Sequence, residues 1–203
     1  TEVYPSDSTY TLTFSLKGDT LHQVYETFSN KDTFTNLTNH TYFNLSGDIK
    51  RDILDHTLII KASKVGNLNQ DFISKSLMNV EKTVFDFNQE KPLKDAIIPL
   101  KKTHQLGLDH PFMLGDQTIV LKDKESKRTL LIKTNNECVV VYSNNFLIEE
   151  PLAGGMKDRS HLSICLETQH YPNDIHFFDY PKSFHAKNTS HQQVTTYKVT
   201  NDD

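Results

Sequence analysis

Apolar and polar residues alternate along much of the chain, which is the pattern of β-strands with one covered face. Residues 9–16 show the pattern most clearly, and their apolar side chains share one face: Tyr10, Leu12, Phe14 and Leu16. A turn at Gly18-Asp19 follows, and residues 21–29 form a plausible return strand. The beginning of the chain is therefore predicted to be a β-hairpin.

Further strands are predicted where short β-branched or alternating runs recur, at residues 55–62, 118–123, 128–134, 137–143, 163–169 and 193–200. Residues 64–81 have no clear period and are predicted to be a loop with short strands, whereas 91–100, bounded by two prolines, suits one helical turn. A glycine-containing loop is expected at 152–155. Many short strands without a sustained period of 3.6 indicate an all-β antiparallel sandwich, with residues 1–203 forming a single domain.

Composition narrows the classes of partner. A net charge of −4 disfavours nucleic acid and anionic membranes, and no apolar run approaches the length of a membrane span. Cys138 and Cys165 both lie in apolar runs, so buried free thiols are expected rather than a disulfide. The first residues contain no signal-peptide pattern, and a cytoplasmic protein is therefore expected.

Residues 36–47, NLTNHTYFNLSG, are dense in neutral hydrogen-bonding groups around one histidine. Donors and acceptors without clustered positive charge suit a ligand with many hydroxyls, such as a sugar. A polar turn between two strands is the alternative, because Asn, Ser, Thr and Gly are turn formers. Interleaved residues such as Leu37 and Phe43 favour a partly buried segment over a simple turn.

Three side chains could carry acid–base or binding chemistry. Glu167 lies in an otherwise apolar strand, where a pocket would raise its pKa and suit a general base; an exposed strand end is the alternative. His40 could act as a general acid, or could be a core or turn histidine bonded to backbone. Asp109 could accept two sugar hydroxyls, or could cap the turn before Pro111.

Metal binding is not expected, because the histidines and cysteines form no common ligand spacing. A phosphorylated sugar is also disfavoured, since a phosphate site would draw on clustered arginines. The three arginines are widely spread along the chain: Arg51, Arg128 and Arg159.

Taken in order, six segments resemble the aldose 1-epimerases (galactose mutarotases): residues 36–47, 55–58, 85–87, 107–112, 141–143 and 164–172. The resemblance implies a large galactose mutarotase-like β-sandwich with the sugar in an open cleft. It implies that Glu167 is the general base and His40 the general acid, both touching the sugar. Asp109, Tyr42 and the neighbouring Thr41 are expected to bind the sugar.

The implied activity is exchange between the α and β anomers of a free hexose such as galactose or glucose, with no cofactor. The family has an N-terminal segment carrying an Arg and a His that hold the sugar, and this sequence is expected to begin after it. A partner segment or chain would then complete the site. The alternative is a non-catalytic carbohydrate-binding module or inactive homologue. Val140 stands where the family often has Gln, which leaves the preferred sugar open, as is the oligomeric state.

Overall fold

The chain folds almost entirely into antiparallel strands. The computed structural model describes residues 7–147, 151–152, 155 and 157–201. Its elements are β1 (Ser8–Lys17), β2 (Thr20–Ser29), β3 (Thr33–Phe34), β4 (Tyr42–Phe43), β5 (Thr57–Leu68), β6 (Ser74–Asn79), β7 (Lys91–Pro92), α1 (Lys94–Leu100), β8 (Asp109–Asp123), β9 (Arg128–Thr134), β10 (Cys138–Tyr142), β11 (Ile164–Gln169), the 3-10 helix η2 (Asp174–His176), β12 (Phe184–His185) and β13 (Ser190–Asn201).

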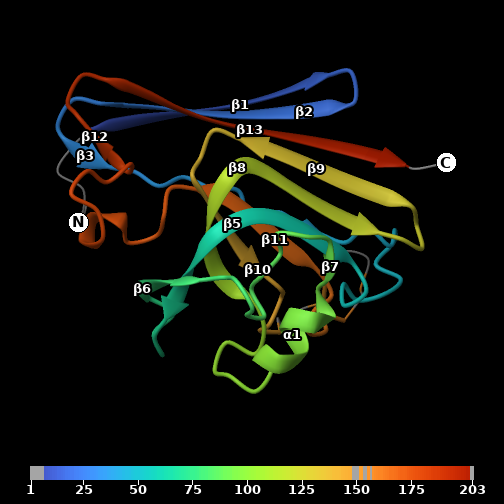
Figure 1. Ribbon diagram of the computed structural model, residues 1–203. Coiled ribbons are helices and arrows are strands. Elements are labelled where there is room, and N and C mark those ends of the chain that lie inside the picture. The colour runs from blue at the N-terminus through green and yellow to red at the C-terminus, as the bar shows by residue number, and fades with distance from the viewer. Residues whose placement is uncertain (1–6, 148–150, 153–154, 156, 202–203) are drawn as a thin grey trace.

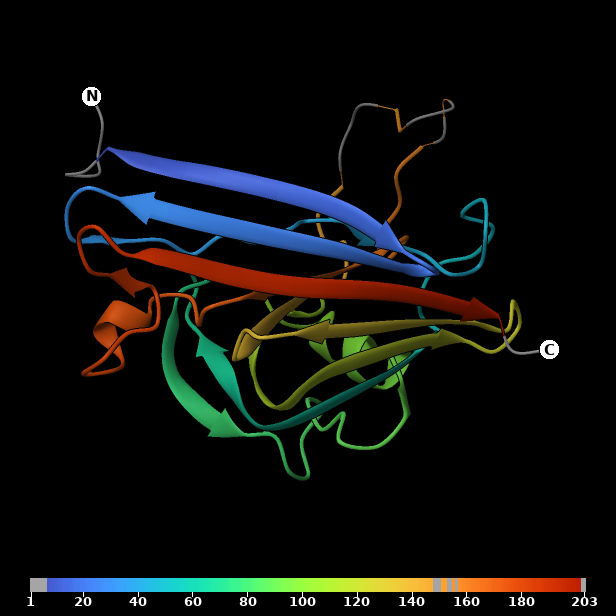
Figure 2. The ribbon, with the colours of Figure 1, turned by 90° about the horizontal axis from the view of Figure 1, so that it is seen from above.

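The main sheet follows the path β1-β2-β13-β9-β8-β10-β11-β4, and β5 joins it by pairing with β6, β7 and β8. The long strands β1, β2 and β13 form one layer, and α1 lies at the far end of the molecule (Figure 1). Seen from above, β1 is the outermost strand, followed by β2 and β13 (Figure 2). Strands β3 and β12 form a separate two-stranded pair.

Strand β8 belongs to both layers of the sandwich. Its first part, 109–113, pairs with β10, whereas its last part, 118–123, pairs with β9. Between them lies Gly115, where an added Cβ would meet the backbone oxygen of Lys61 at 3.1 Å, and Gln117 has a positive φ of 58°. The neighbouring strand β5 shifts register at Ile60/Ala62. These irregularities bend the strand, so that one continuous sheet folds over itself.

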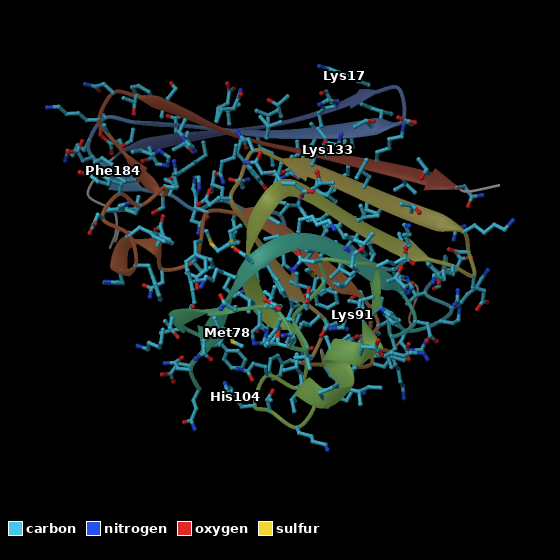
Figure 3. All side chains as sticks on the ribbon, in the orientation of Figure 1. Lys17, Met78, Lys91, His104, Lys133 and Phe184 are labelled. Carbon is cyan, nitrogen blue, oxygen red and sulfur yellow. The ribbon has the colours of Figure 1, made fainter. Side chains whose placement is uncertain are left out.

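The core lies between the two layers, and side chains fill the space enclosed by the curved sheet (Figure 3). Fully buried apolar side chains come from β5, β8, β9, β10 and β11, including Leu58 of β5, Phe112 of β8 and Ile164 of β11. Helix α1 closes one end with buried Ala96 and Ile97. The all-β antiparallel sandwich expected from the sequence is confirmed.

The boundaries of two strands, β8 and β5, differ from those expected from the sequence. Residues 109–123 form one strand, whereas a strand was expected only at 118–123, because β8 bends at Gly115 yet pairs with β5 on both sides of the bend. Residues 64–68 continue β5 instead of starting a loop, since their partners in β6 follow only after a short turn. The loop expected at 152–155 lies partly outside the described residues.

The apolar face of β1 is not covered. Its residues are 48% to 73% exposed: Tyr10, Leu12, Phe14 and Leu16. A groove of about 380 Å³ runs beside this face, lined also by Phe43 and Tyr197. The alternation correctly predicted a strand, but the burial that alternation normally signals is missing, because among the described residues little packs over this face of β1.

Cys138 and Cys165 are both buried and free, as expected. Among the helices of the described residues, none is long and apolar enough to cross a membrane.

Candidate functional site

Strands β8, β10, β11 and β4 lie side by side and align four residues in one row across the sheet. Asp109 of β8 lies opposite Tyr142 of β10, Tyr142 opposite Cys165 of β11, and Cys165 opposite Tyr42 of β4. Residues directly opposite in an antiparallel pair point to the same face. Glu167 is two positions beyond Cys165 on β11 and therefore shares that face too.

The polar stretch 36–47 positions His40 beside this row. The side-chain amide of Asn36 donates to the backbone oxygen of His170 at 3.0 Å and accepts from its N–H at 2.9 Å. Asn44 donates to the backbone oxygen of Leu162 at 2.7 Å. These amides therefore bind the protein's own backbone, which corrects the expectation that the whole stretch offers its hydrogen-bonding groups to a ligand. Their effect is to fix the segment that carries His40.

His40 and Glu167 form the central pair of the site. Nε2 of His40 lies 3.3 Å from Oε1 of Glu167. The histidine side chain is 48% exposed, whereas the glutamate side chain is only 12% exposed. The rings of Tyr42 and Tyr142 flank His40, with centroids 4.9 Å and 5.8 Å from its own. The structure brings together a carboxylate, an imidazole and two aromatic rings at an accessible surface.

Burial raises the pKa of the Glu167 carboxyl, and the nearby carboxylate of Asp109 raises it further, while His40 acts in the opposite direction. The alternative of an exposed strand-end glutamate therefore does not hold, because the side chain is enclosed and its charge is partly desolvated. A carboxylate with a raised pKa is a stronger base. Chemically, Glu167 is suited to accept a proton from a bound hydroxyl.

Asp109 lies at the start of β8, and burial raises its pKa to about 6, with His40 acting in the opposite direction. Among the described residues, no group donates a hydrogen bond to its carboxylate. It does not cap a turn before Pro111, because it is already paired in the sheet opposite Tyr142. The carboxylate is thus available to accept hydrogen bonds from a ligand.

The backbone just before Asp109 is held by a compact network. The N–H of Leu108 donates a hydrogen bond to Oγ of Ser143 at 2.9 Å, and the carbonyl of Leu108 accepts one from Nδ2 of Asn145 at 2.8 Å. Only a glycine fits beside this network. An added Cβ at Gly107 would lie 2.2 Å from Oδ1 of Asn145 and 2.6 Å from Oγ of Ser143. The backbone at Gly107 and Leu108 is therefore held in place, and this fixes the position from which the Asp109 side chain extends.

Four of the five expected site residues come together: Glu167, His40, Asp109 and Tyr42. Thr41 does not join them, because its side chain lines the separate groove beside Phe14 and Tyr197 and bonds to Asn39. Neighbouring residues on a strand point to opposite faces, which explains the separation from Tyr42.

Two residues at the site were missed by the sequence reasoning. The ring of Tyr142 packs near His40, and Sγ of Cys165 lies 3.3 Å from Nδ1 of His40. Cys165 could have been found from the sequence, since it stands two residues before Glu167 in a predicted strand. Tyr142 lies in the segment 141–143 that carries the family resemblance, but its position beside His40 depends on the pairing of β10 with β8 and β11.

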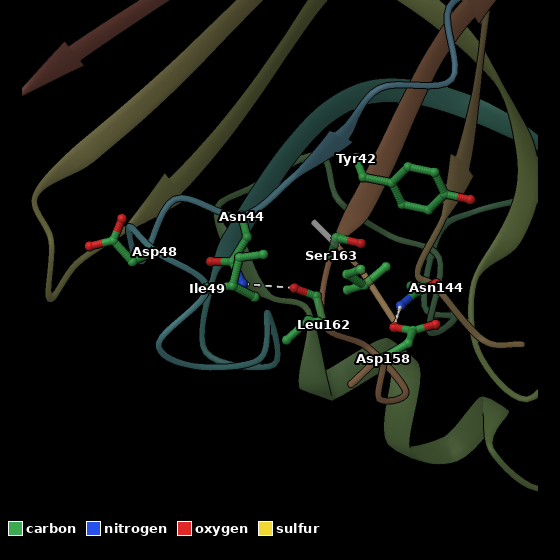
Figure 4. Close-up of a pocket in the computed structure, with 9 residues that line it drawn as sticks. Tyr42, Asn44, Asp48, Ile49, Asn144, Asp158, Leu162 and Ser163 are labelled. Atoms are coloured by element: carbon green, nitrogen blue, oxygen red, sulfur yellow. Dashed lines mark hydrogen bonds between the residues drawn. The ribbon is translucent and has the colours of Figure 1, made fainter. Parts of the chain in front are cut away.

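A pocket of about 370 Å³ adjoins the site at Tyr42. Figure 4 shows Tyr42 at one side of it, with Ser163 between Tyr42 and Leu162, and with Asn144 donating to Asp158. The pocket walls are largely apolar, with the Asp48 and Asp158 carboxylates among the lining groups. The site therefore has open space beside the aromatic pair. Among the described residues, no group of three His, Cys, Asp or Glu side chains is arranged to hold a metal ion.

Comparison with known proteins gives one consistent result. The family model described as "Aldose 1-epimerase" matches residues 1–198. The chain is 30% identical to the aldose 1-epimerase of Haemophilus influenzae over 177 residues, which cover 84% of this chain and 52% of that protein. It is 29% identical to the galactose mutarotase of Mus musculus, over 97% of this chain and 59% of the relative. The chain thus spans little more than half the length of these relatives.

Solved structures have the same fold. The galactose 1-epimerase of Lactobacillus acidophilus superposes with a TM-score of 0.83 at 25% identity, over 98% of this chain and 59% of that one. An aldose epimerase homologue from C. elegans gives a TM-score of 0.85 at 21% identity, over 98% of this chain and 62% of that one. At that identity the second likeness shows the fold alone.

Proposed function

Because the chain belongs to the aldose 1-epimerase family, we propose that it interconverts the α and β anomers of a free hexose, galactose or glucose. Glu167 is the general base and His40 the general acid in this proposal. Asp109 and Tyr42 bind the sugar. The observation that carries the proposal is the 3.3 Å contact between His40 Nε2 and Glu167 Oε1.

The reaction needs an acid and a base that act on neighbouring oxygens. Glu167 removes the proton of the hydroxyl on C1 while His40 protonates the ring oxygen. The bond between C1 and the ring oxygen breaks, and C1 becomes an aldehyde. Rotation about C1–C2 and closure on the other face of the carbonyl give the other anomer, with acid and base exchanging roles.

The spacing of the pair suits this chemistry. The hydroxyl oxygen and the ring oxygen are both bonded to C1, so the groups that serve them must also be close together. Glu167 and His40 come from different segments yet their reactive atoms are in contact. The raised pKa of the Glu167 carboxyl favours proton removal, and no redox step or group transfer is involved.

Sugar binding has its own support. Asp109 offers a carboxylate that no group among the described residues occupies, and its pKa of about 6 leaves it mostly ionised at neutral pH. The rings of Tyr42 and Tyr142 provide apolar faces against which a sugar ring can pack. Because the chain covers 52% to 59% of its curated relatives, the substrate is inferred from this site and from the family.

The test is polarimetry on freshly dissolved α-D-galactose and α-D-glucose. The chain is expected to accelerate mutarotation above the spontaneous rate, and Glu167→Gln is expected to lose about 10²–10⁴-fold of that acceleration. The matched control is Glu137→Gln, which alters another partly buried glutamate in contact with a histidine: Nδ1 of His170 lies 3.1 Å from Oε2 of Glu137.

Equal rates for the wild-type chain and Glu167→Gln would refute the proposal. Saturable sugar binding without anomer exchange would identify a carbohydrate-binding module instead. If Glu137→Gln lost as much activity as Glu167→Gln, the loss would reflect general damage to the fold. Circular dichroism of each variant checks that possibility directly.

A further inference from the structure

Three histidines from separate elements of the fold meet in one cluster. His170 follows β11, His185 belongs to β12 and His191 belongs to β13. The ring centroids of His170 and His191 lie 5.3 Å apart, and those of His185 and His191 lie 4.5 Å apart. His170 and His185 are only 4% exposed, and the proposed acid–base chemistry uses none of the three rings. These three side chains are called the histidine cluster below.

The histidine cluster anchors the segment that leads to His40. The hydroxyl of Thr35 is hydrogen-bonded to Nε2 of His185. Asn36 binds the backbone of His170 through both ends of its side-chain amide, at 3.0 Å and 2.9 Å. These two anchored residues stand at the start of segment 35–40, which ends with the proposed general acid. The position of His40 therefore depends on where the cluster holds this segment.

The contact between His170 and His191 has room for one hydrogen. The carboxylate of Glu137 lies 3.1 Å from Nδ1 of His170 and accepts its N–H. On the other side of the ring, Nε2 of His170 faces Nε2 of His191 at 3.2 Å. A hydrogen bond between two ring nitrogens needs one that carries a hydrogen and one that does not. The pair keeps this contact with no positive charge or with one, but a second proton would place two N–H groups face to face.

The charges around the cluster oppose a second proton as well. Within the described residues, the titratable groups that act on the three rings are Glu137, which precedes β10, and the rings themselves. Burial lowers the pKa of His185 to about 4, and the other two rings lower it further. Burial and His170 also lower the pKa of His191, while Glu137 acts in the opposite direction. One carboxylate can balance one imidazolium, so the closed cluster has no partner for a second.

We propose that His170, His185 and His191 form an acid-sensitive anchor, which holds segment 35–40 in place at neutral pH and releases it when the cluster takes up a second proton. The anchor is a property of the fold and goes beyond the proposed function. Its effect on anomer exchange rests on the proposed function, because that effect acts through the position of His40.

The direction of the pH dependence follows from the pKa values. When the cluster is open, its histidines bind protons at their ordinary pKa of about 6.5, whereas the closed cluster binds them less readily. A fall in pH therefore favours the open state. For His185 alone, a closed-state pKa of about 4 shifts the equilibrium towards opening by roughly 10²-fold between neutral pH and pH 4.

Amide hydrogen exchange without sugar measures the opening. Two N–H groups report on the anchor: that of Thr35, which donates to the backbone oxygen of Ser183 at 2.9 Å, and that of His170, which donates to Asn36 at 2.9 Å. After correction for the intrinsic effect of pH on exchange, both are expected to lose at least about tenfold of their protection between about pH 7.5 and about pH 5.

The decisive variant is the double change His185→Gln with His191→Gln. Glutamine can still hydrogen-bond to the Thr35 hydroxyl and to Nε2 of His170, but it does not titrate. Protection in this variant is expected to change less than about threefold over the same pH range. His176→Gln is the control, because it replaces an exposed histidine outside the cluster and is expected to behave as the wild type.

Glu137→Gln tests the charge balance. The amide oxygen can still accept the Nδ1–H of His170 at neutral pH, so the cluster stays closed there. Without the carboxylate the first proton is no longer balanced, and the loss of protection is expected to begin at a higher pH than in the wild type.

Polarimetry adds the effect on the site. The wild-type chain is expected to lose more of its mutarotation rate at about pH 5 than the double glutamine variant does, and to recover it on return to neutral pH. Asp109 titrates in the same range but is present in both proteins, so the difference between them reports the anchor alone.

Equal loss of protection in the wild type and the double variant would overturn the proposal, as would unchanged protection in the wild type. If the double variant does not fold, His185→Gln and His191→Gln are measured singly, and each must lose less protection than the wild type. A wild-type chain that loses protection at acid pH but shows no mutarotation at any pH would leave the anchor standing and reject the proposed function. The two failures are separated because protection is measured without substrate.

Discussion

Nε2 of His40 and Oε1 of Glu167 lie 3.3 Å apart, although His40 precedes the short strand β4 and Glu167 belongs to β11, far along the chain. The pairing of Cys165 with Tyr42 brings these segments together. In the proposed reaction the acid and the base act together, because one oxygen must lose a proton while the other gains one. The consequences for variants follow from this relationship.

His40→Asn is expected to reduce the mutarotation rate by about 10²–10⁴-fold, because the ring oxygen loses its proton donor. Combining it with Glu167→Gln is expected to cost little beyond the more damaging single change, since residues that act as a unit are strongly non-additive. Polarimetry on the two single variants and the double variant measures this. Fully multiplicative losses would show that the two groups act independently.

Asp109→Asn is expected to stabilise the fold while weakening sugar binding. Burial raises the pKa of Asp109 to about 6, whereas an unfolded chain has an ordinary aspartate pKa of about 3.9. Above pH 6 both states are ionised and the folded state carries the full cost of burying the charge. Removing the charge is expected to increase the free energy of unfolding at pH 8 by about 1–3 kcal/mol.

The pH dependence of that gain has a definite sign. As the pH falls through 6 towards 4, the folded Asp109 takes up its proton before the unfolded one, and the cost disappears. The advantage of Asp109→Asn should therefore vanish near pH 4. Urea unfolding at pH 8, 6 and 4 tests this, with the exposed Asp116→Asn on the same strand as control. An advantage that grew on acidification would contradict the assignment.

Wild-type sugar binding is expected to weaken below about pH 6. The protonated side chain of Asp109 accepts hydrogen bonds from hydroxyls less strongly than the ionised carboxylate does. Because the pKa of Asp109 without sugar is about 6, the affinity is expected to begin falling near that pH. Titration calorimetry with galactose between pH 5 and 8 measures the affinity. Binding that is independent of pH in this range would argue against a direct contact between Asp109 and the sugar.

Gly107→Ala is expected to displace Asp109 and raise KM. The new Cβ would lie 2.2 Å from Oδ1 of Asn145, so the network around Leu108 must move. Overpacking of this kind costs about 1–3 kcal/mol of stability. Gly18→Ala is the control, because it meets nothing within 4 Å and its φ of +61° adds only a local cost. Gly18→Ala should lower stability slightly and leave KM unchanged.

The exposed face of β1 is expected to cause self-association. Leu12 and Leu16 are 48% and 73% exposed on an edge strand, a combination that invites pairing with other chains. Replacing both with Thr is expected to reduce the concentration-dependent increase in apparent mass. Light scattering over a dilution series measures this, with Thr11→Ser and Thr13→Ser on the opposite face as control. Equal behaviour of the two pairs would reject the prediction.

Local patterns were sufficient to predict most strands and the sandwich class. The alternation in β1 and β13 and the apolar run of β10 each reflect a strand that the structure contains. The continuity of β8 was not predictable, because Gly115 normally marks a turn and its role here depends on β5 beside it. The burial of a face was also beyond prediction, since it is decided by what covers the strand.

For the candidate site too, the sequence predicts which residues take part but not how they are arranged. His40, Glu167, Asp109 and Tyr42 were identified from residue type and resemblance, and the structure brings them together. Their mutual distances depend on the register between β4, β8, β10 and β11, which no local pattern encodes. For the same reason, nothing in the sequence indicated that Asn36 and Asn44 are occupied by backbone groups.

Strand β8 ties the site to the opposite layer, and this has a consequence for cooperativity. Its first residues carry Asp109 and pair with β10, its last residues pair with β9, and β5 pairs with both parts. Local opening of the end that carries Asp109 must therefore disturb a strand that the rest of the fold holds in place. The amide hydrogens of β8 should therefore exchange with solvent only when the whole sandwich unfolds. The free energy of opening this strand would then equal the free energy of global unfolding.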